Sequence, residues 1–353
     1  MAQDNTRKKI ALGMSGGVDS SVSAVLLQKA GYDVTGVFLE CWRAPGCRAE
    51  EDRKDALAIA LKLGIPFQVL DFKEAYRQKV VEYFFETYKA GKTPNPDVLC
   101  NKEIKFGLFY DWAMEQGFDA VATGHYAQII DNALVRSVDE HKDQTYFLYR
   151  LREEQLSHVL FPIGHLTKPE VRKLAKEYEL LTATKPDSQG ICFIGEINVH
   201  NFLKDRLGEN PGDVVDTKGR VIGRHKGLWF YTIGQRHGFD DAFVVKTIEG
   251  IDKHAIPPFY VIHKDGEKNQ LVVGFGAETY KDTFEIEDIH WIRSSSGEDD
   301  QKLMVRIRHT GQLIPCTLKG NKINLCEAQQ GVASGQSAVF YHQDTCYGGG
   351  III

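Results

Sequence analysis

The chain has 353 residues, of which 42% are hydrophobic and 26% are charged, and its formal net charge at pH 7 is −5. This length predicts two or three domains with packed cores, and the negative charge argues against indiscriminate binding to nucleic acid, although it allows a local basic face. No apolar run approaches the roughly 20 residues of a membrane-spanning helix, and the first nine residues contain no apolar segment of a secretory signal. Seven cysteines without such a signal favour reduced thiols, so we expect a cytoplasmic protein with no membrane partner.

In the first half of the chain, short apolar runs alternate with segments of helical periodicity. Strands are predicted at residues 10–12, 34–39, 67–70 and 120–123, and helices at residues 22–30, 52–63, 74–90, 102–116 and 168–178. Thr167 and Glu170 form the capping box of the last of these helices. The alternation predicts a Rossmann-like α/β domain, in which a parallel sheet carries helices on both faces.

The second half of the chain has a different texture. After Asn210 glycines become frequent, helical periodicity ends, and apolar residues occupy every second position at Leu303, Val305 and Ile307. Hairpin turns are predicted at residues 264–266 and 319–321. We therefore expect an α/β domain over residues 1–205, a small β-rich domain over 206–272 and a C-terminal β-barrel over 273–353.

Residues 13–20 read Gly-Met-Ser-Gly-Gly-Val-Asp-Ser and lie between a predicted strand and a predicted helix. Gly16 and Gly17 permit a positive φ, and the free N–H groups of a helix start attract an anion. The lysine of the common phosphate-binding loop is missing, since nothing between Gly13 and Leu26 is basic. A tight βα turn whose glycines serve packing is the alternative.

The loop resembles the pyrophosphate loop (PP-loop) of the N-type ATP pyrophosphatases, which cleave ATP to AMP and pyrophosphate. The resemblance implies that ATP and Mg²⁺ are bound here, with Asp19 helping to hold the metal ion. The implied nucleotide-binding residues are Gly13, Met14, Ser15, Gly16, Gly17, Val18, Asp19 and Ser20.

Three residues are candidates for a catalytic role: Cys100, Cys192 and Asp97. Cys100 follows two prolines ahead of a predicted helix, so the helix N-terminus, with Lys102 and Lys105, is expected to lower the pKa of its thiol. From the residues alone, a buried small hydrophobe is an equal alternative for Cys100 and the favoured interpretation for Cys192. Asp97 alone reads as a turn residue after proline.

A set of motifs that occur in a fixed order along the chain favours a catalytic role for these residues over a structural one. They lie at residues 13–20, 95–101, 122–126, 142–144, 187–195, 234–236, 315–316 and 335–341. Together they resemble the tRNA-specific 2-thiouridylases along essentially the whole chain. The resemblance implies ATP-dependent adenylation of the C2 oxygen of the wobble uridine, followed by sulfur transfer from a cysteine persulfide with release of AMP. Cys192 would carry the persulfide, Cys100 would be the second thiol, and Asp97 the general acid/base. A Cys100–Cys192 disulfide would form and need a reductant.

The same resemblance assigns further binding residues. Leu39 and Gly124 would line the adenine site, and Asn95, Pro96 and Asp97 would meet the target base. Contacts to tRNA are implied for His125, Lys142, Asp143, Gln144, Arg308, His309 and Gln336. An ordinary solvated surface is the alternative for this last group. The implied partners are tRNA and a sulfur donor, either a sulfur-relay protein or a cysteine desulfurase.

Some alternatives and one conformational expectation remain. Cys100, Cys192 and Asp97 could instead hold a [4Fe-4S] cluster, although the carboxylate of Asp is a hard ligand and iron–sulfur clusters prefer thiolates. Apart from this alternative we expect no resident metal, because Cys41 and Cys47 lack the spacing of zinc ligands. Two rival functions remain. The chain could be another PP-loop tRNA-modifying ligase, or a protein that only binds RNA or carries sulfur. Because both thiols flank proline- or glycine-bearing segments, we expect a loop rearrangement on tRNA binding to bring them together.

Overall fold

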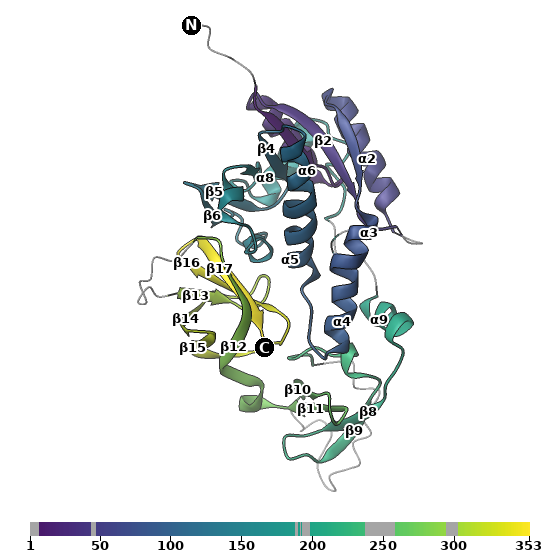
Figure 1. Cartoon of the computed structure of the whole chain (residues 1–353), viewed down its shortest axis with the longest axis vertical. Helices are drawn as coiled ribbons and strands as arrows, with labels where there is room; N and C mark the ends of the chain where they lie inside the picture. Colours follow the sequence, from purple (N-terminus) through teal and green to yellow (C-terminus); the bar gives the residue numbers. More distant parts are fainter. Residues whose placement is uncertain are drawn as a thin grey trace.

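In a computed structural model of the chain, the described residues are 7–43, 47–187, 190, 192, 198–236, 258–293 and 303–353. The N-terminal domain is built on a parallel sheet with the strand order β3-β2-β1-β4-β7 (Figure 1). Its strands are β1 (Lys9–Gly13), β2 (Asp33–Glu40), β3 (Phe67–Asp71), β4 (Ala120–Thr123) and β7 (Val159–Leu160). The predicted parallel sheet is therefore confirmed. The carboxyl ends of its central strands β1 and β4 lead directly into the candidate site.

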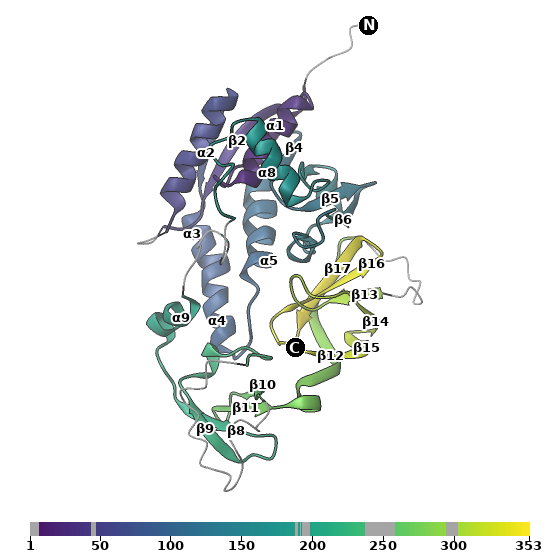
Figure 2. The same ribbon diagram turned by 180° about the vertical axis from the view of Figure 1, so that it is seen from behind.

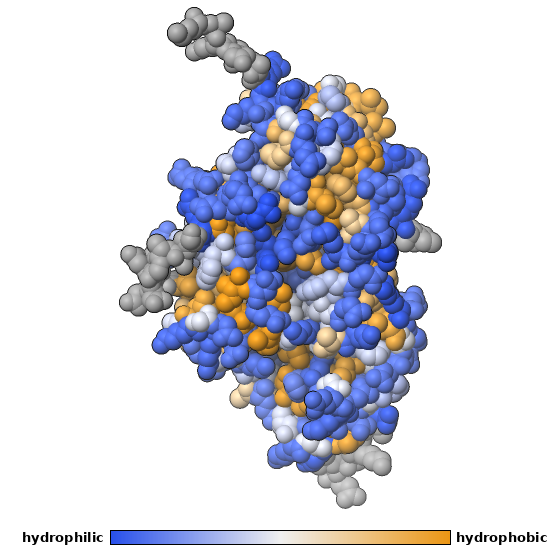
Figure 3. Space-filling view, in the orientation of Figure 1, coloured by the Kyte–Doolittle hydropathy of each residue, from blue (hydrophilic) through white to orange (hydrophobic). Residues whose placement is uncertain are grey.

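Helices cover both faces of the sheet, because neighbouring residues of its strands point to opposite sides. Ile10 and Leu12 of β1 pack with α1 (Val18–Lys29), α2 (Ala49–Leu63) and α8 (Lys168–Glu177). Ala11 points to the other face, toward the two long helices described next. The molecular surface in Figure 3 is largely hydrophilic, with apolar patches that include the α2 side, where Leu57 and Leu61 stay exposed.

The long helices on the second face are each interrupted by a π-helical segment. The first consists of α3 (Lys73–Tyr76), η1 (Arg77–Val81) and α4 (Glu82–Lys89), and the second of α5 (Pro96–Cys100), η2 (Asn101–Leu108) and α6 (Phe109–Glu115). The second helix begins six residues before the predicted start at 102. Asn95 caps it through Oδ1, which accepts from the Val98 N–H at 3.4 Å, and Pro96 fills the first turn. Cys100 consequently lies inside the helix rather than ahead of it.

The second half of the chain folds as the predicted β-rich pair. Strands β8 (Gly212–Val215), β9 (Val221–His225), β10 (Tyr260–Asp265) and β11 (Gln270–Gly274) form a small sheet in the order β10-β11-β8-β9. It follows α9 (Val199–Leu207). The predicted domain boundary between residues 272 and 273 falls inside β11, so the strand pairing carries this sheet slightly further along the chain.

The C-terminal domain is the expected β-barrel. Its strands are β12 (Tyr280–Trp291), β13 (Leu303–Arg306), β14 (Ile314–Lys319), β15 (Lys322–Gln330), β16 (Ser337–His342) and β17 (Thr345–Ile352). They follow the order β12-β15-β14-β13-β16-β17, and pairing of β12 with β17 closes the barrel (Figures 1 and 2). Val305 and Phe340 fill its interior.

A hairpin of the N-terminal domain, which the sequence did not reveal, attaches the barrel. Strands β5 (Ala127–Ile130) and β6 (Ala133–Arg136) extend the barrel sheet through a pairing of Val135 with Thr345. A buried ion pair between Asp143 and Arg306 Nη1, at 2.7 Å, lies at the same junction. The barrel is thereby fixed next to the helix that carries Cys100. Within the described residues, no helix has the length and apolarity needed to span a membrane.

Candidate active site

The loop of residues 13–20 connects β1 to α1 with its backbone tightly held. Gly16 has φ +73°, and a Cβ on it would lie 2.2 Å from the Asp52 carbonyl oxygen, so only glycine fits. The Ser15 N–H donates to Ser20 Oγ at 3.2 Å, and the Ser21 hydroxyl donates to the Gly17 carbonyl at 2.8 Å. The helix begins at Val18, four residues before the predicted start. Its first N–H groups therefore lie within the loop, where an anion cradle is predicted.

Two lysines from distant segments lie beside the loop, which has no lysine of its own. Lys168, at the start of α8, places Nζ 2.8 Å from both carboxylate oxygens of Asp19. Lys185 Nζ lies 2.9 Å from the Gly16 carbonyl oxygen and 2.8 Å from Asp52 Oδ1, and it also pairs with Asp55. Sequence reasoning missed both, because no local spacing links them to the loop. They bring positive charge to the place where a polyphosphate would lie.

Asp187 gathers further cations beside this loop. Its carboxylate lies 2.7 Å from Lys142 Nζ, 2.9 Å from Lys168 Nζ and 2.7 Å from Arg172 Nη2. Burial works against the charged form, but the hydrogen bonds from Lys142 and Lys168 outweigh it and lower the pKa of Asp187 to about 2. Lys142, expected at the tRNA, is thus placed in the ion-pair network that surrounds the nucleotide loop.

The two predicted thiols meet, although 92 positions separate them in the sequence. Cys100 Sγ lies 3.4 Å from Cys192 Sγ. The Cys192 N–H donates to Asp97 Oδ1 at 3.0 Å, and the Tyr76 hydroxyl donates to the Cys192 carbonyl. The structure thus brings Cys100, Cys192 and Asp97 together. A loop rearrangement on tRNA binding stays a prediction.

The electrostatics of the pair differ from the sequence expectation. Burial raises the pKa of the Cys100 thiol, so the expected lowering by a helix N-terminus is wrong: the thiol lies in the core, inside the helix. The low pKa belongs to Cys192, whose anion accepts a hydrogen bond from Cys100 and is further favoured by the Lys105 charge. Burial also raises the pKa of Asp97, against the opposing hydrogen bond from Cys192. A thiol with a raised pKa, a thiol with a lowered pKa and a carboxyl group able to move a proton thus lie side by side.

The segment after β4 contacts both the nucleotide loop and the surroundings of the thiol pair. A Cβ on Gly124 would lie 2.8 Å from the Ser20 N, so this glycine allows the strand end to approach the nucleotide loop closely. The Tyr126 hydroxyl donates to Asp19 Oδ1 at 2.9 Å. His125, expected at the tRNA, is buried, with Nδ1 2.7 Å from Thr123 Oγ1 and Nε2 3.3 Å from Lys105 Nζ. Leu39, expected at the adenine, is buried on the face of the sheet that carries the thiols.

A pocket of about 280 Å³ opens beside Asp97. Its lining residues are Phe84, Tyr88, Pro94, Asn95, Pro96, Asp97, Tyr146, Phe147, Val199, His309 and Gln336. The His309 ring lies 4.3 Å from the Phe147 ring, and Gln336 Nε2 donates to the Pro94 carbonyl at 2.9 Å. Residues expected to meet the base (Asn95, Pro96, Asp97) and the tRNA (His309, Gln336) therefore share one pocket with aromatic walls. Such walls can stack an unpaired base.

The remaining predicted tRNA contacts are scattered. Arg308 is exposed at the end of the barrel strand β13, whereas Gln144 is partly buried and accepts from the Tyr126 N–H at 3.0 Å. Asp143 is buried in its ion pair with Arg306 and accepts from the Thr145 hydroxyl. The geometry thus gives Asp143 a structural role at the domain junction. A contact with RNA remains a prediction for this set.

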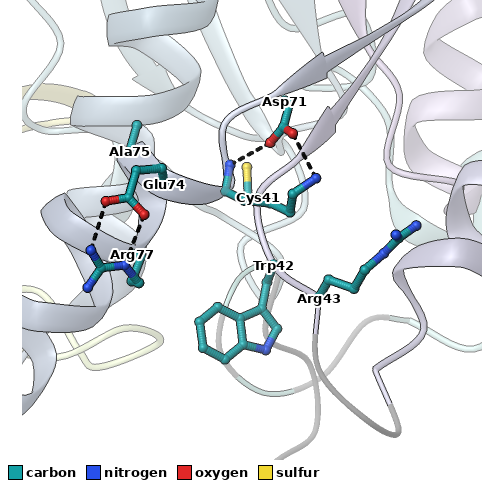
Figure 4. A pocket seen from close by; sticks show the side chains of 8 residues that line it. Cys41, Trp42, Arg43, Asp71, Glu74, Ala75 and Arg77 are labelled. Carbon is teal, nitrogen blue, oxygen red and sulfur yellow. Dashed lines mark hydrogen bonds and ion pairs between the residues drawn. The ribbon is translucent and has the colours of Figure 1, made fainter.

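A second pocket, of about 650 Å³, is lined by residues that follow β2 and by residues from the end of β3 to the start of η1 (Figure 4). Cys41 contributes its sulfur to the lining, and burial raises the pKa of that thiol. The cations around the pocket are already paired: Lys73 with Asp71 at 2.8 Å and Arg77 with Glu74 at 2.7 Å. The lining therefore has little net charge to offer a ligand.

Fold and site together define a nucleotide-binding α/β domain of the PP-loop type, carrying a thiol pair and followed by two β-rich domains. Residues 8–196 match the family described as tRNA methyl transferase HUP domain. Residues 200–275 match the tRNA methyl transferase PRC-barrel domain, and residues 281–352 the aminomethyltransferase beta-barrel domain. The chain belongs to the family of the tRNA-specific 2-thiouridylases.

Relatives and solved structures differ in how closely they resemble the chain. It is 43% identical to the tRNA-specific 2-thiouridylase MnmA of Pseudomonas fluorescens strain SBW25, over 99% of this chain and 96% of that protein. The identity is also 43% to the enzyme of the same name from strain Pf0-1, over 99% and 96%. Among solved structures, the U34-tRNA thiolase NcsA from Methanococcus maripaludis with its [4Fe-4S] cluster is 19% identical, over 58% of this chain and 66% of that one, with a TM-score of 0.37. A likeness of this size carries no functional argument.

Proposed function

We propose that this chain is an ATP-dependent tRNA-uridine 2-sulfurtransferase, which replaces the C2 oxygen of the wobble uridine of tRNA with sulfur. The observation that carries the proposal is the contact of Cys100 and Cys192 at 3.4 Å, next to Asp97 and a base-sized pocket. Full-length relatives at 43% identity are named for 2-thiolation of tRNA, which supports the same reaction here.

The nucleotide loop would serve the activation of the oxygen. The N–H groups at the start of α1, together with Lys168 and Lys185, would hold the polyphosphate of ATP. Asp19 offers carboxylate oxygens suited to Mg²⁺ bound with the phosphates. Transfer of AMP to the C2 oxygen turns a poor leaving group into a good one, and pyrophosphate leaves.

The thiol pair would then supply the sulfur. Cys192 carries a persulfide, and its terminal sulfur attacks C2, so that AMP leaves with the former C2 oxygen. The Cys100 thiolate then attacks the Cys192 sulfur, the sulfur–sulfur bond to the base breaks, and the 2-thiouridine is released. Alternatively, Cys100 attacks Cys192 and releases hydrosulfide, which attacks C2. Either route ends with a Cys100–Cys192 disulfide that an external thiol must reduce. Asp97, with its raised pKa, can hold and return the proton that these steps move.

The aromatic pocket would receive the base once it leaves the anticodon stack. It has a volume of about 280 Å³ and aromatic walls that could stack a base. Asn95 to Asp97 line the pocket and form the cap and first residues of the helix that carries Cys100, so a bound base would lie close to the thiols. Arg308, which is exposed, is a proposed contact to the tRNA backbone.

The sulfur donor and the cell compartment remain predictions from the sequence. A sulfur-relay protein or a cysteine desulfurase, each carrying a persulfide, is the proposed donor, and the cytoplasm is the proposed compartment. The iron–sulfur alternative requires a third cluster ligand beside the two thiols. Within the described part of the chain, no three His, Cys, Asp or Glu side chains are grouped to hold a metal ion. Visible absorbance of anaerobically purified protein tests this alternative.

The test of the proposed function uses the purified full chain with ATP, Mg²⁺, unmodified tRNA and a low-molecular-weight persulfide. We expect tRNA-dependent pyrophosphate release and 2-thiouridine in the digested tRNA, identified by mass spectrometry. Cys192→Ser is expected to abolish 2-thiouridine, while Cys326→Ser, at an exposed cysteine of the barrel, retains it. A PP-loop ligase of another kind would tolerate Cys192→Ser, and a protein that only binds RNA would release no pyrophosphate.

A further inference from the structure

Lys105 reaches the thiol pair because its helix is π-helical at that point. It lies in η2 (Asn101–Leu108), five positions after Cys100. In an α-helix, five positions turn a side chain by about 140° away from the first one. In a π-helical segment, residues five apart are joined by the backbone hydrogen bond and lie on nearly the same side. The helix that positions Cys100 thus also directs an ammonium group at the sulfur atoms.

The contacts of Lys105 define its charge state and that of its neighbour. Lys105 Nζ donates a hydrogen bond to Cys192 and lies 3.3 Å from His125 Nε2. Burial disfavours the ammonium, but the negative charges at Cys192, Cys100 and Asp97 outweigh it and raise the pKa of Lys105. Burial, reinforced by the Lys105 charge, lowers the pKa of His125, so its ring is neutral.

The His125 tautomer follows from these contacts. An ammonium group can only donate, so Nε2 must accept from Lys105. The ring proton is therefore on Nδ1, which donates to Thr123 Oγ1 at 2.7 Å. Thr123, at the end of β4, consequently holds the His125 ring by a hydrogen bond, and the ring holds Lys105 by accepting a hydrogen bond from its ammonium group.

Several ionisable groups surround Cys192, and Lys105 is the cation among them. The groups that face it from the packed elements are Cys41, Tyr76, Asp97, Cys100, Lys105 and, through Lys105, His125. The thiols, the phenol and the carboxyl group all oppose a negative sulfur when they ionise. Removing Lys105 would take away a positive charge that favours the anion, while the Cys100 hydrogen bond would remain.

We propose that Lys105 is a further catalytic residue that keeps the Cys192 sulfur anionic during sulfur uptake, and that His125 is the positioning residue that holds Lys105 there. The inference rests on the proposed function. The Cys192 thiolate attacks the outer sulfur of the donor persulfide, the sulfur–sulfur bond of the donor breaks, and the donor leaves as a thiolate that takes a proton from solvent. The outer sulfur becomes the terminal sulfur on Cys192, with no net oxidation, and Lys105 keeps its proton.

The test measures alkylation of Cys192 by iodoacetamide as a function of pH, followed by mass spectrometry of the peptide that contains it. We expect Lys105→Met to move the midpoint up by about 1 to 2 pH units, because loss of a nearby cation disfavours the anion. Lys105→Arg retains the charge and is expected to stay within about half a unit. Lys102→Met is the matched control, since this lysine of η2 is exposed and pairs with Glu103 at 3.2 Å.

Lys105→Gln provides a second neutral variant if Lys105→Met does not fold, and His125→Phe is expected to shift the midpoint in the same direction by less. An unshifted midpoint in the folded neutral variants would overturn the proposal, as would an equal shift in Lys102→Met. Because this assay needs neither ATP nor tRNA, its result is separate from the thiolation assay. A shifted midpoint without thiolation would leave the role of Lys105 standing and reject only the proposed reaction.

Discussion

The nucleotide loop and the thiol pair use charge in opposite ways. Around the loop, carboxylates and cations from five segments share contacts, and their side chains remain partly exposed: Asp19 is 31% exposed and Asp187 28%. Around the thiols, Cys100 is fully buried and Lys105 is the cation that stands against the anion. Shared contacts tolerate the loss of one member, whereas a buried charge with one counter-charge does not. Substitutions should therefore have graded effects at the loop and near-complete effects at the thiols.

The largest effect is expected for Cys100→Ala, which tests whether the two halves can be separated. Formation of 2-thiouridine should fall about 10³-fold or more, because the second thiol is lost. Pyrophosphate release that depends on tRNA should persist, because the loop is untouched. Parallel assays of the two products make the comparison. Loss of pyrophosphate release together with 2-thiouridine would show that the halves act as one unit.

Lys168→Met tests the nucleotide loop. Pyrophosphate release should fall about 10²-fold, as is typical when one electrostatic donor to a reacting group is removed, and 2-thiouridine should fall with it. The pH midpoint of Cys192 alkylation should not change. The control is Lys173→Met, an exposed lysine of the same helix whose Nζ lies 3.8 Å from a Glu177 oxygen. A shifted Cys192 midpoint in Lys168→Met would contradict the separation of the two charge networks.

Gly16→Ala measures how tightly the loop backbone is packed. The new Cβ adds a positive-φ penalty of about 1 kcal/mol to a clash with the Asp52 carbonyl, so the free energy of unfolding should fall by about 2 to 3 kcal/mol. Gly31, near the other end of α1, also has positive φ but open space around it, and Gly31→Ala should cost only the φ penalty. Urea denaturation of both variants isolates the clash. Equal losses would show that the loop can relax.

The smallest effect is expected for Asp187→Asn and depends on pH. The pKa of Asp187 is lowered to about 2 from an ordinary value near 3.8, so its pairing stabilises the fold fully above pH 4 and progressively less as pH falls toward 2. Allowing for partial exposure, the loss at pH 7 should be about 1 kcal/mol, and it should shrink at pH 3. Urea denaturation at both values checks the sign. A loss that grows on acidification would contradict it.

Local signals predicted the parts of the site that the backbone builds alone. The nucleotide loop, the parallel sheet, the capping box of Thr167 and Glu170 and the barrel strands follow from turn chemistry and periodicity over a few residues. Helix starts were less well predicted. The N-terminal helix begins at Val18 and the thiol helix at Pro96, because serines and prolines were taken as loop residues although they can occupy a first helical turn.

Electrostatic predictions failed where burial decided the outcome. The Cys100 thiol was expected to be the acidic one from its position in the sequence, yet its complete burial raises its pKa, and Lys105 acts on Cys192 instead. Lys168 was predicted as the start of a capped helix, yet its ammonium group pairs with Asp19 at the loop. The β5–β6 hairpin was missed because its strands are four residues each and stable only against the barrel.

The sequence by itself determined the chemistry available to this protein: a glycine loop that accepts an anion, two thiols and a carboxylate in ordered motifs. Only the tertiary structure decided which thiol has the lowered pKa, which lysines reach the loop, and that Cys100 and Cys192 are in contact. The reason is physical. Backbone preferences are set by neighbours in the chain, whereas desolvation and charge pairing depend on groups that folding brings together from distant segments.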